Sequence, residues 1–413
     1  MLTLKILFWT CIALVVYTYV GYGALLWLIL RVKRLFAKSE EPPMPADADL
    51  PAMTLMICAY NEEAVVHEKM ANIRQLDYPR EKLCVMWVTD GSTDGTNDLL
   101  RQYGDEVTLV FSPERRGKAV AMEHGLGVNR APFVVFTDAN TMLNAGALRE
   151  IARQFTKPGV SCVSGEKRVA ARTTPSDSAA TAQKQGQTET TAEGQAAAEG
   201  EGLYWRYESK LKQWDSDLYS AMGAAGELFA VRMEHYRRAP QNALLDDFMM
   251  SMLIVADGHR IAYTSQAYAT EYGSANMREE SKRKRRIAAG GLQSSWWLRS
   301  LMNPFRYPRV AFQFVSHRVL RWTITPLAML ALIPLNAALA IKDAGMVYTV
   351  IAALQAAFYL AALAGWLLNT SGHKSKLLNV PVYFLFMNLN VFIGIRYLMT
   401  HKSSGTWEKV SRG

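Results

Sequence analysis

The sequence contains few of the residues that hold disulfide-rich domains or structural metal sites together. Four cysteines are spread over 413 residues with no close pair, which excludes a disulfide scaffold and a zinc ribbon. The seven histidines show no spacing typical of metal ligands. We therefore expect Cys11, Cys58, Cys84 and Cys162 to be small apolar side chains in reduced surroundings.

Charged residues are missing from four long runs, which lie at the two ends of the chain. About 20 apolar residues suffice to cross a bilayer as a helix, so each run is a candidate membrane span. The first run is longer than the apolar region of a signal peptide, which favours an uncleaved anchor. The runs cover residues 6–30, 323–341, 344–368 and 377–395.

Basic residues cluster between Arg31 and Lys38, directly after the first run, which places the following segment in the cytoplasm. The excess of 46 Lys and Arg over 37 Asp and Glu is typical of cytoplasmic loops facing anionic lipid, and we expect no nucleic-acid partner. We predict an integral protein of the inner or plasma membrane. Its parts are an anchor over residues 1–36, three transmembrane helices over 323–399 and a tail over 400–413.

The residues between these ends, about 50–291, read as one cytosolic α/β domain. Apolar, β-branched runs alternate with helical stretches, which is typical of parallel βαβ units. Ligands bind at the carboxyl ends of such strands, and Asp90 and Asp138 both fall there. Strands are expected over 54–59, 83–89, 107–111 and 133–137, with helices over 62–75 and 117–128 between them.

Two segments depart from this alternation. Residues 172–202 contain no Leu, Ile, Val, Phe, Trp or Tyr, so we predict a disordered surface insertion, with a mobile lid as the alternative. Residues 292–322 mix apolar and basic side chains, which favours helices lying in the membrane interface; buried linkers are the other interpretation.

Several short motifs follow one another in the middle domain, and their order is more specific than any one of them. Taken alone, Asp90 to Thr96 would be a tight turn that caps a helix. The motifs are Ala59-Tyr60-Asn61-Glu62, Asp90 to Thr96, Arg115 to Lys118, Asp138-Ala139-Asn140, Leu245-Asp246-Asp247 and a cationic run at 283–286. Together they resemble the family-2 glycosyltransferases, which have a GT-A fold and use nucleotide-diphosphate sugars. The closer resemblance is to the membrane-embedded cellulose, chitin, hyaluronan and poly-N-acetylglucosamine synthases.

The resemblance implies a binding site for a UDP-sugar donor. Ala59, Tyr60 and Glu62 match the strand-end motif that lines the nucleoside pocket, although Cys58 stands where proline is usual. Asp90 matches the carboxylate that accepts a hydrogen bond from the uracil ring. These positions are expected to hold the nucleoside part of the donor.

The resemblance also implies a site for Mg²⁺ or Mn²⁺ beside the donor diphosphate. Asp138 matches the first acid of the family's Asp-x-Asp, and Asn140 replaces the second, so one formal charge is lost while an oxygen ligand is kept. Lys118 matches a basic residue near the nucleotide, and Glu123 replaces an expected asparagine.

Two further positions are expected to act in catalysis. Asp247 falls where the family places its base, a carboxylate that takes the acceptor proton, with Asp246 as a helix cap or supporting acid. Arg286 is the one match to the Gln-x-x-Arg-Trp of processive members and would bind the diphosphate, because Arg283 and Ile287 replace the Gln and Trp.

We therefore expect an inverting glycosyltransferase that elongates a glycan for export. Single-sugar transfer to a lipid-linked acceptor is the alternative that the missing Gln and Trp favour. A non-catalytic, nucleotide-binding subunit of a synthase complex is a third reading. Membrane lipids and synthase subunits are the expected partners. A second near-match to the processive motif, at 318–322, is interpreted as an interfacial anchor, and the glycine-containing stretch at 223–232 resembles an acceptor-side turn or is an ordinary tight turn.

Overall fold

The computed structural model describes the chain in five stretches. These are residues 1–36, 41–170, 192–272, 277–371 and 375–400. The predicted insertion lies outside the described residues up to position 191, as does the predicted tail beyond Thr400.

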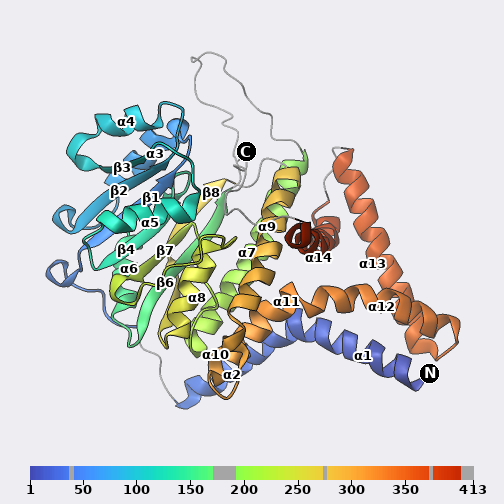
Figure 1. Ribbon diagram of the computed structural model, residues 1–413. Helices are drawn as coiled ribbons and strands as arrows, with labels where there is room; N and C mark the ends of the chain where they lie inside the picture. Colours follow the sequence, from blue (N-terminus) through green and yellow to red (C-terminus); the bar gives the residue numbers. More distant parts are fainter. Residues whose placement is uncertain (37–40, 171–191, 273–276, 372–374, 401–413) are drawn as a thin grey trace.

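Eight strands form one sheet in the order β3-β2-β1-β4-β7-β6-β8-β5 (Figure 1). The first four are parallel, as their alternation with helices predicts. The sequence did not indicate the other half, where β7 runs antiparallel to both β4 and β6. The strands are β1 (Met53–Ala59), β2 (Leu83–Asp90), β3 (Thr108–Ser112), β4 (Phe133–Asp138), β5 (Met142–Leu143), β6 (Val160–Ala170), β7 (Leu228–Arg232) and β8 (Arg260–Tyr272).

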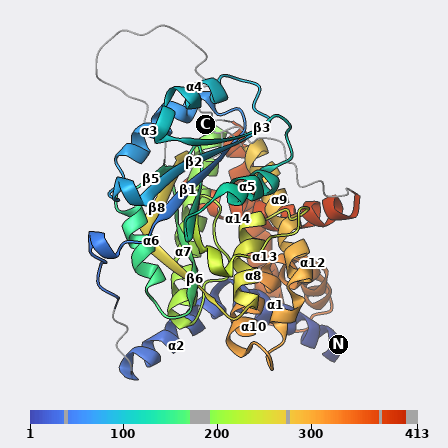
Figure 2. The same ribbon diagram turned by 60° about the vertical axis from the view of Figure 1, so that its left-hand side comes forward.

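A layer of helices covers each face of the sheet, because each face carries a separate apolar cluster (Figure 2). One face packs against α3 (Glu63–Arg74), α4 (Thr96–Gln102) and α6 (Ala147–Phe155). The other packs against α5 (Lys118–Val128) and α8 (Asp246–Ala256). The loops at the carboxyl ends of β1, β2 and β4 are therefore held between two packed layers.

Four helical stretches among the described residues are long and apolar enough to cross a membrane, in the four regions where the sequence predicts spans. The first is continuous over 35 residues, from α1 (Leu2–Val16) through a π-helical turn (Tyr17–Gly21) to α2 (Tyr22–Phe36). The others are α12 (Ile324–Ile341), α13 (Met346–Thr370) and α14 (Lys376–Thr400). These helices lie on the opposite side of the molecule from the sheet (Figure 1).

Two long helices stand between the sheet and the apolar helices (Figure 1). α7 (Ala192–Leu218) begins inside the stretch predicted to be disordered, because alanine and glutamate favour helix even where no apolar face is present. α9 (Met277–Trp297) runs through the boundary predicted at 291. Short helical pieces follow it, namely η6 (Arg299–Met302), α10 (Pro308–Phe314), η7 (Val315–Val319) and α11 (Leu320–Trp322).

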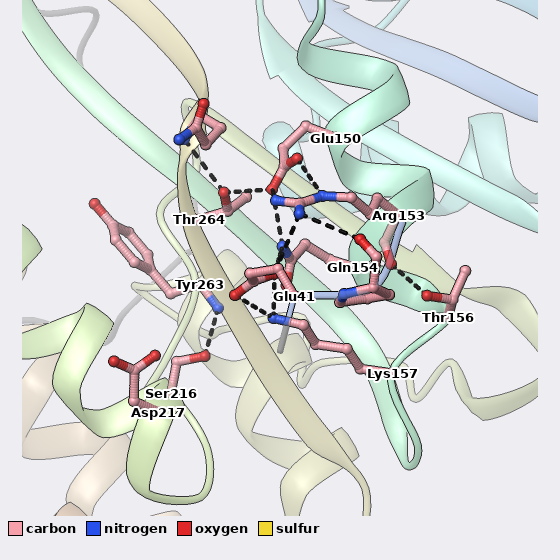
Figure 3. A network of polar contacts seen from close by, with 12 residues as sticks. Glu41, Glu150, Arg153, Gln154, Thr156, Lys157, Ser216, Asp217, Tyr263 and Thr264 are labelled. Carbon is pink, nitrogen blue, oxygen red and sulfur yellow. Dashed lines mark hydrogen bonds and ion pairs between the residues drawn. The ribbon is translucent and has the colours of Figure 1, made fainter. Parts of the chain in front are cut away.

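A polar network fastens the segment after α2 to the sheet domain (Figure 3). Glu41 forms ion pairs with Lys157 at 2.9 Å and with Arg153 at 3.5 Å. Arg153 also pairs with Glu150 at 2.8 Å, and the Thr264 hydroxyl donates to Glu150 at 2.7 Å. Burial alone would raise the pKa of Glu150, but Arg153 and its other donors hold that pKa below its ordinary value. The network therefore joins α6, β8 and the segment that begins at Glu41.

Candidate active site

The two motifs predicted to bind the nucleoside form one hydrogen-bonded unit at the ends of β1 and β2. Asn61 adopts a left-handed backbone (φ 54°), which places its N–H 3.1 Å from the Ser92 hydroxyl. The Thr93 N–H donates to the Asn61 side chain at 2.8 Å, and the Glu62 N–H donates to the Thr96 hydroxyl at 2.9 Å. Neighbouring parallel strands bring these loops together, as the sequence predicts.

Asp90 ends β2 and is 5% exposed. Its two carboxylate oxygens accept the backbone N–H groups of Arg116 at 2.8 Å and Gly117 at 2.7 Å. Gly91 follows with φ 67°, and a Cβ there would come within 2.5 Å of the Arg115 nitrogen. Asp90 therefore fixes the loop before α5, while each oxygen keeps a lone pair for a ligand donor.

Tyr60 lies beside this loop and forms a stacked pair with a cation. The Arg115 guanidinium lies 3.9 Å from the centroid of the Tyr60 ring, a cation–π geometry. Ala59, the residue before Tyr60, is buried. Cys58 is half-buried two residues before Tyr60, and burial raises the pKa of its thiol to about 12, so the thiol is protonated at neutral pH.

Lys118 and Asp138 form an ion pair at 2.6 Å between the start of α5 and the end of β4. Burial opposes the charge on Lys118, but the carboxylates of Asp138 and Asp246 raise its pKa above the ordinary value. Asp138 is partly exposed, and Asn140 is half-buried two residues later. The pair brings together two residues that the sequence assigned to one site.

Sequence reasoning missed a lysine below this turn. Lys69 is fully buried on α3, and its ammonium donates to the Thr141 carbonyl at 2.5 Å and to the Thr137 hydroxyl at 3.3 Å. Burial lowers the pKa of Lys69 to about 7, against the opposing effect of Asp138. The ammonium thus supports the turn from the side of the sheet. The available signal was a charged residue on the apolar face of a helix.

Asp246 and Asp247 begin α8 on the other side of the site. Burial first, and then the charge of Asp246, raise the pKa of Asp247 to about 6, while Lys118 acts to lower it. One Asp247 oxygen accepts the Phe248 N–H at 2.8 Å, and the other lies where a Cβ on Gly226 would come within 2.8 Å. In the part of the chain that the structure describes, one buried oxygen of Asp246 has no hydrogen-bond partner.

The residue after Gly226 connects this acid pair to α9. Glu227 lies 3.1 Å from Lys167 and 3.1 Å from Arg283, and Lys167 also pairs with Glu271. Although burial disfavours the ionised form, Lys167 and Arg283 hold the pKa of Glu227 far below its ordinary range. Arg286 lies half-buried on the same helix, and no ion pair joins it to the other predicted site residues among those described. Arg283 is the residue of this helix that pairs with the loop after Gly226, and the role of Arg286 at the diphosphate stays a prediction.

The cationic run of α9 is half-buried or buried along its whole length. None of its side chains from Lys282 to Arg286 is exposed. Lys284 lies 5.7 Å from the ring centroid of Tyr383 on α14, and Arg285 lies 5.7 Å from that of Tyr397. The run is enclosed between the sheet domain and an apolar helix.

The segment interpreted as an interfacial anchor also packs against the site. Trp322 meets Phe248, the neighbour of Asp247, edge to face with ring centroids 5.3 Å apart. Arg318 donates to the Met222 carbonyl at 2.8 Å, just before the glycine-containing turn. The sequence placed these two residues at the membrane surface because their type is common there. In the structure Trp322 packs against α8, which carries the acids, and Arg318 bonds to the residue before the glycine-containing stretch.

Oxygen atoms that could ligate a divalent cation lie on β4 and the turn after it. Asp138 and Asn140 offer a carboxylate and an amide oxygen, the ligand types that Mg²⁺ and Mn²⁺ prefer. Within the described ranges no group of three or more His, Cys, Asp or Glu side chains could hold a metal ion. The pair fits a cation that takes its remaining ligands from water and a diphosphate.

Comparison with known proteins identifies the domain. Residues 51–290, more than half of the chain, match the model of glycosyltransferase-like family 2. A poly-beta-1,6-N-acetyl-D-glucosamine synthase of Staphylococcus aureus is 25% identical over 137 residues, 32% of each chain. A beta-monoglucosyldiacylglycerol synthase of Synechocystis is 30% identical over 156 residues, 36% of this chain and 33% of the relative. The chain thus spans about a third of the length of these curated relatives.

One solved structure has the same fold over nearly the whole chain. It is a mannosyltransferase from Pyrobaculum calidifontis in complex with GDP-Man and Mn2+, with a TM-score of 0.67 and 22% identity. The match covers 95% of this chain and 99% of that one, so the GT-A domain and the apolar helices are both included. The match to the family model, the GT-A fold and the four apolar helices agree, and the chain belongs to glycosyltransferase-like family 2, as a membrane-embedded enzyme.

Proposed function

We propose that this protein transfers a sugar from a UDP-sugar to a growing glycan, with inversion, at the cytoplasmic face of the inner or plasma membrane, and that the product is exported. The observation that carries the proposal is that two sets of side chains meet at one site. Lys118, Asp138 and Asn140 supply a cation and oxygen ligands, and Asp247 supplies a carboxylate whose pKa of about 6 lies close to neutral pH. An enzyme of this kind needs a donor site and a base facing it.

The donor would lie across the ends of the parallel strands. The Tyr60 and Arg115 pair offers a flat surface to a nucleoside, and Asp90 offers its remaining lone pairs to the base. Lys118 would face the diphosphate, and Asp138 with Asn140 would hold the divalent cation. That cation neutralises charge on the diphosphate leaving group when it is bound.

The transfer step needs one base and no covalent intermediate. An acceptor hydroxyl oxygen attacks the anomeric carbon while the bond from that carbon to the diphosphate oxygen breaks. The hydroxyl proton passes to Asp247, whose pKa of about 6 leaves it ionised at neutral pH yet basic enough to accept a proton. Attack on the face opposite the leaving group inverts the anomeric centre, and the nucleoside diphosphate departs with both electrons of the broken bond.

The acceptor is inferred from the named products of the relatives and from the motif replacements. The two curated relatives are named for a polysaccharide product and for a glycolipid product, so chain growth and single transfer to a lipid are both represented. We place the growing glycan first because the predicted motifs resemble the polymer synthases. Transfer to a lipid-linked acceptor is the second candidate, which the replacement of Gln and Trp by Arg283 and Ile287 favours.

The test is nucleoside diphosphate release by detergent-purified protein with a panel of UDP-sugars and GDP-sugars, in Mg²⁺ or Mn²⁺. We expect turnover with one UDP-sugar that is lost in Asp247→Asn. Asp257→Asn is the matched control, because Asp257 is exposed at the far end of the same helix and pairs with Arg237. Nucleotide binding without turnover of any donor would favour a non-catalytic subunit, and turnover only with a GDP-sugar would overturn the donor assignment.

A further inference from the structure

The strands β4 and β7, which lead to the two halves of the site, are neighbours in the middle of the sheet (Figure 1). They run antiparallel, and the last pair of their ladder is Thr137 with Leu228. Beyond that pair, β4 continues into the turn that begins at Asp138, and β7 is preceded by the turn that ends at Glu227. The separation of the two turns is therefore decided where this ladder ends.

One side chain extends the connection past the last ladder pair. Thr137 is 2% exposed, and its hydroxyl donates to the Glu227 carbonyl at 3.0 Å. The ammonium of Lys69 donates to the same hydroxyl at 3.3 Å, and the Thr141 hydroxyl lies 3.0 Å from it. A buried hydroxyl cannot exchange such a bond for one to bulk water without a cost, so the contact between the two turns is held.

The Glu227 side chain is fixed independently of its carbonyl. It is 8% exposed and lies 3.1 Å from Lys167 on β6 and 3.1 Å from Arg283 on α9. Cations on two elements therefore hold the carboxylate, and a displacement of Glu227 would separate buried charges, which is costly. The β7 side of the link is thus anchored to the sheet and to α9.

The residues before Glu227 lead directly to the acid pair. A Cβ on Gly226 would come within 2.8 Å of an Asp247 oxygen, so backbone and carboxylate are close here. The Ser251 hydroxyl on α8 accepts the Ala224 N–H at 3.0 Å and lies 2.8 Å from the Asp247 carbonyl. The turn that ends at Glu227 is therefore joined to α8 as well as to β4.

We propose that Thr137 is a positioning residue, whose hydrogen bond to Glu227 sets the distance between the cation-holding turn and Asp247. This rests on the proposed transferase function, which assigns the cation to Asp138 and the base to Asp247. Transfer requires the anomeric carbon and the base to reach one acceptor hydroxyl, and small displacements of reacting groups lower the rate strongly. Thr137 contacts neither substrate in this scheme, so it acts on the rate through geometry and should change donor affinity little.

The first experiment compares variants by their release of nucleoside diphosphate at saturating donor and Mn²⁺. Thr137→Val replaces the hydroxyl with a methyl group, and Thr137→Ser keeps the hydroxyl. Thr89→Val is the matched control, because Thr89 is fully buried before Asp90 at the end of β2 and its hydroxyl has no partner among the described residues. We expect Thr137→Val to lower kcat about ten- to a hundredfold. Thr137→Ser and Thr89→Val should keep kcat close to the wild-type value.

Calorimetric titration with UDP in the presence of Mn²⁺ separates positioning from binding. The dissociation constant should stay close to the wild-type value in every variant, and the midpoint of thermal unfolding shows that each variant is folded. Wild-type kcat in Thr137→Val, or an equal loss of kcat in Thr137→Ser, would overturn the inference. A loss of UDP affinity as large as the loss of kcat would also overturn it, because Thr137 would then be needed for donor binding.

Hydrogen–deuterium exchange tests the link without turnover. Binding of UDP with Mn²⁺ should slow amide exchange in the turn after β4 and, through Thr137, in residues 223–228. Thr137→Val should keep the first effect and lose the second, a pattern that a general loosening of the fold would not produce. Equal slowing of exchange at residues 223–228 in the variant and in the wild-type protein would contradict the link.

Failure of this inference can be told apart from failure of the proposed function. Loss of turnover in Asp247→Asn together with wild-type turnover in Thr137→Val would reject the link and keep the base. A wild-type protein that binds UDP but turns over no donor would reject the proposed function, and the exchange experiment would still decide whether the two turns are coupled. A protein that does not bind UDP in Mn²⁺ would overturn both.

Discussion

The raised pKa of Asp247 predicts the shape of the pH–rate profile. Its pKa moves from an ordinary value of 3.8 to about 6 because burial and Asp246 disfavour the ionised form. Since a base must be ionised to accept a proton, kcat/KM should fall about tenfold per pH unit below pH 6. Asp247→Asn removes the base and should lower kcat by about 10²–10⁴-fold, and the residual activity should lose this acidic limb.

Two charged neighbours of Asp247 let us predict the direction in which the acidic limb should move when each is removed. Asp246→Asn removes a negative charge beside the carboxylate, so ionisation becomes easier and the limb should move to lower pH, by up to about one unit. Lys118→Met removes the positive charge that lowers this pKa and should move the limb upward. The assay is steady-state release of nucleoside diphosphate at saturating cation across the pH range in which the protein stays folded. A limb near pH 6 that persists in Asp247→Asn, or that moves upward in Asp246→Asn, would refute the assignment.

Three further expectations follow from other contacts. Gly226→Ala should lower kcat about tenfold or more, because the new Cβ would lie within 2.8 Å of an Asp247 oxygen. Gly146→Ala is the control and should leave kcat unchanged, because a Cβ there would meet nothing within 4 Å. Equal kcat values for the two variants would contradict this prediction. Glu208→Gln removes the buried carboxylate that His317, Arg318 and Arg321 share, of which His317 keeps Asp215, and should cost about 3–5 kcal/mol. The cost would be seen as a lower midpoint of thermal unfolding in detergent, whereas an unchanged midpoint would show that the pairs contribute little. Removal of divalent cations with a chelator should abolish turnover and added Mn²⁺ should restore it, and full activity in the chelator would remove the cation from the mechanism.

The sequence predicted those parts of the fold that its patterns describe locally. Four parallel strands and four apolar helices could be placed because each is a continuous run with its own periodicity. The other half of the sheet could not, since β6 and β8, which pair parallel to each other beyond the antiparallel β7, carry buried charges such as Lys167 and Glu271 that break the apolar pattern. The start of helix α7 was not predicted, because the sequence from Ala192 to Gly202 has high helix propensity but no apolar residues at helical spacing.

The sequence predicted which residues belong to the candidate site better than it predicted the contacts between them. The order of motifs gathered Asp90, Lys118, Asp138 and Asp247 into one site, and their catalytic roles stay predictions. The sequence could mark a buried charge such as Lys69 only as a lysine on the apolar face of a helix, because it does not show the carbonyl partner that fixes its place in the site. Pairing across the fold is a property of the three-dimensional arrangement and has no local signal.

The ion pair between Lys118 and Asp138 has a consequence for the order in which substrates are added. A cation arriving alone competes with an ammonium that already neutralises its carboxylate, and Asn140 adds no charge to help it. A donor that arrives with the cation brings a diphosphate that can pair with Lys118 while the cation pairs with Asp138, so both partners of the ion pair are replaced in one step. Saturation kinetics should then show cation and donor entering as one complex, with an apparent cation affinity that rises with donor concentration.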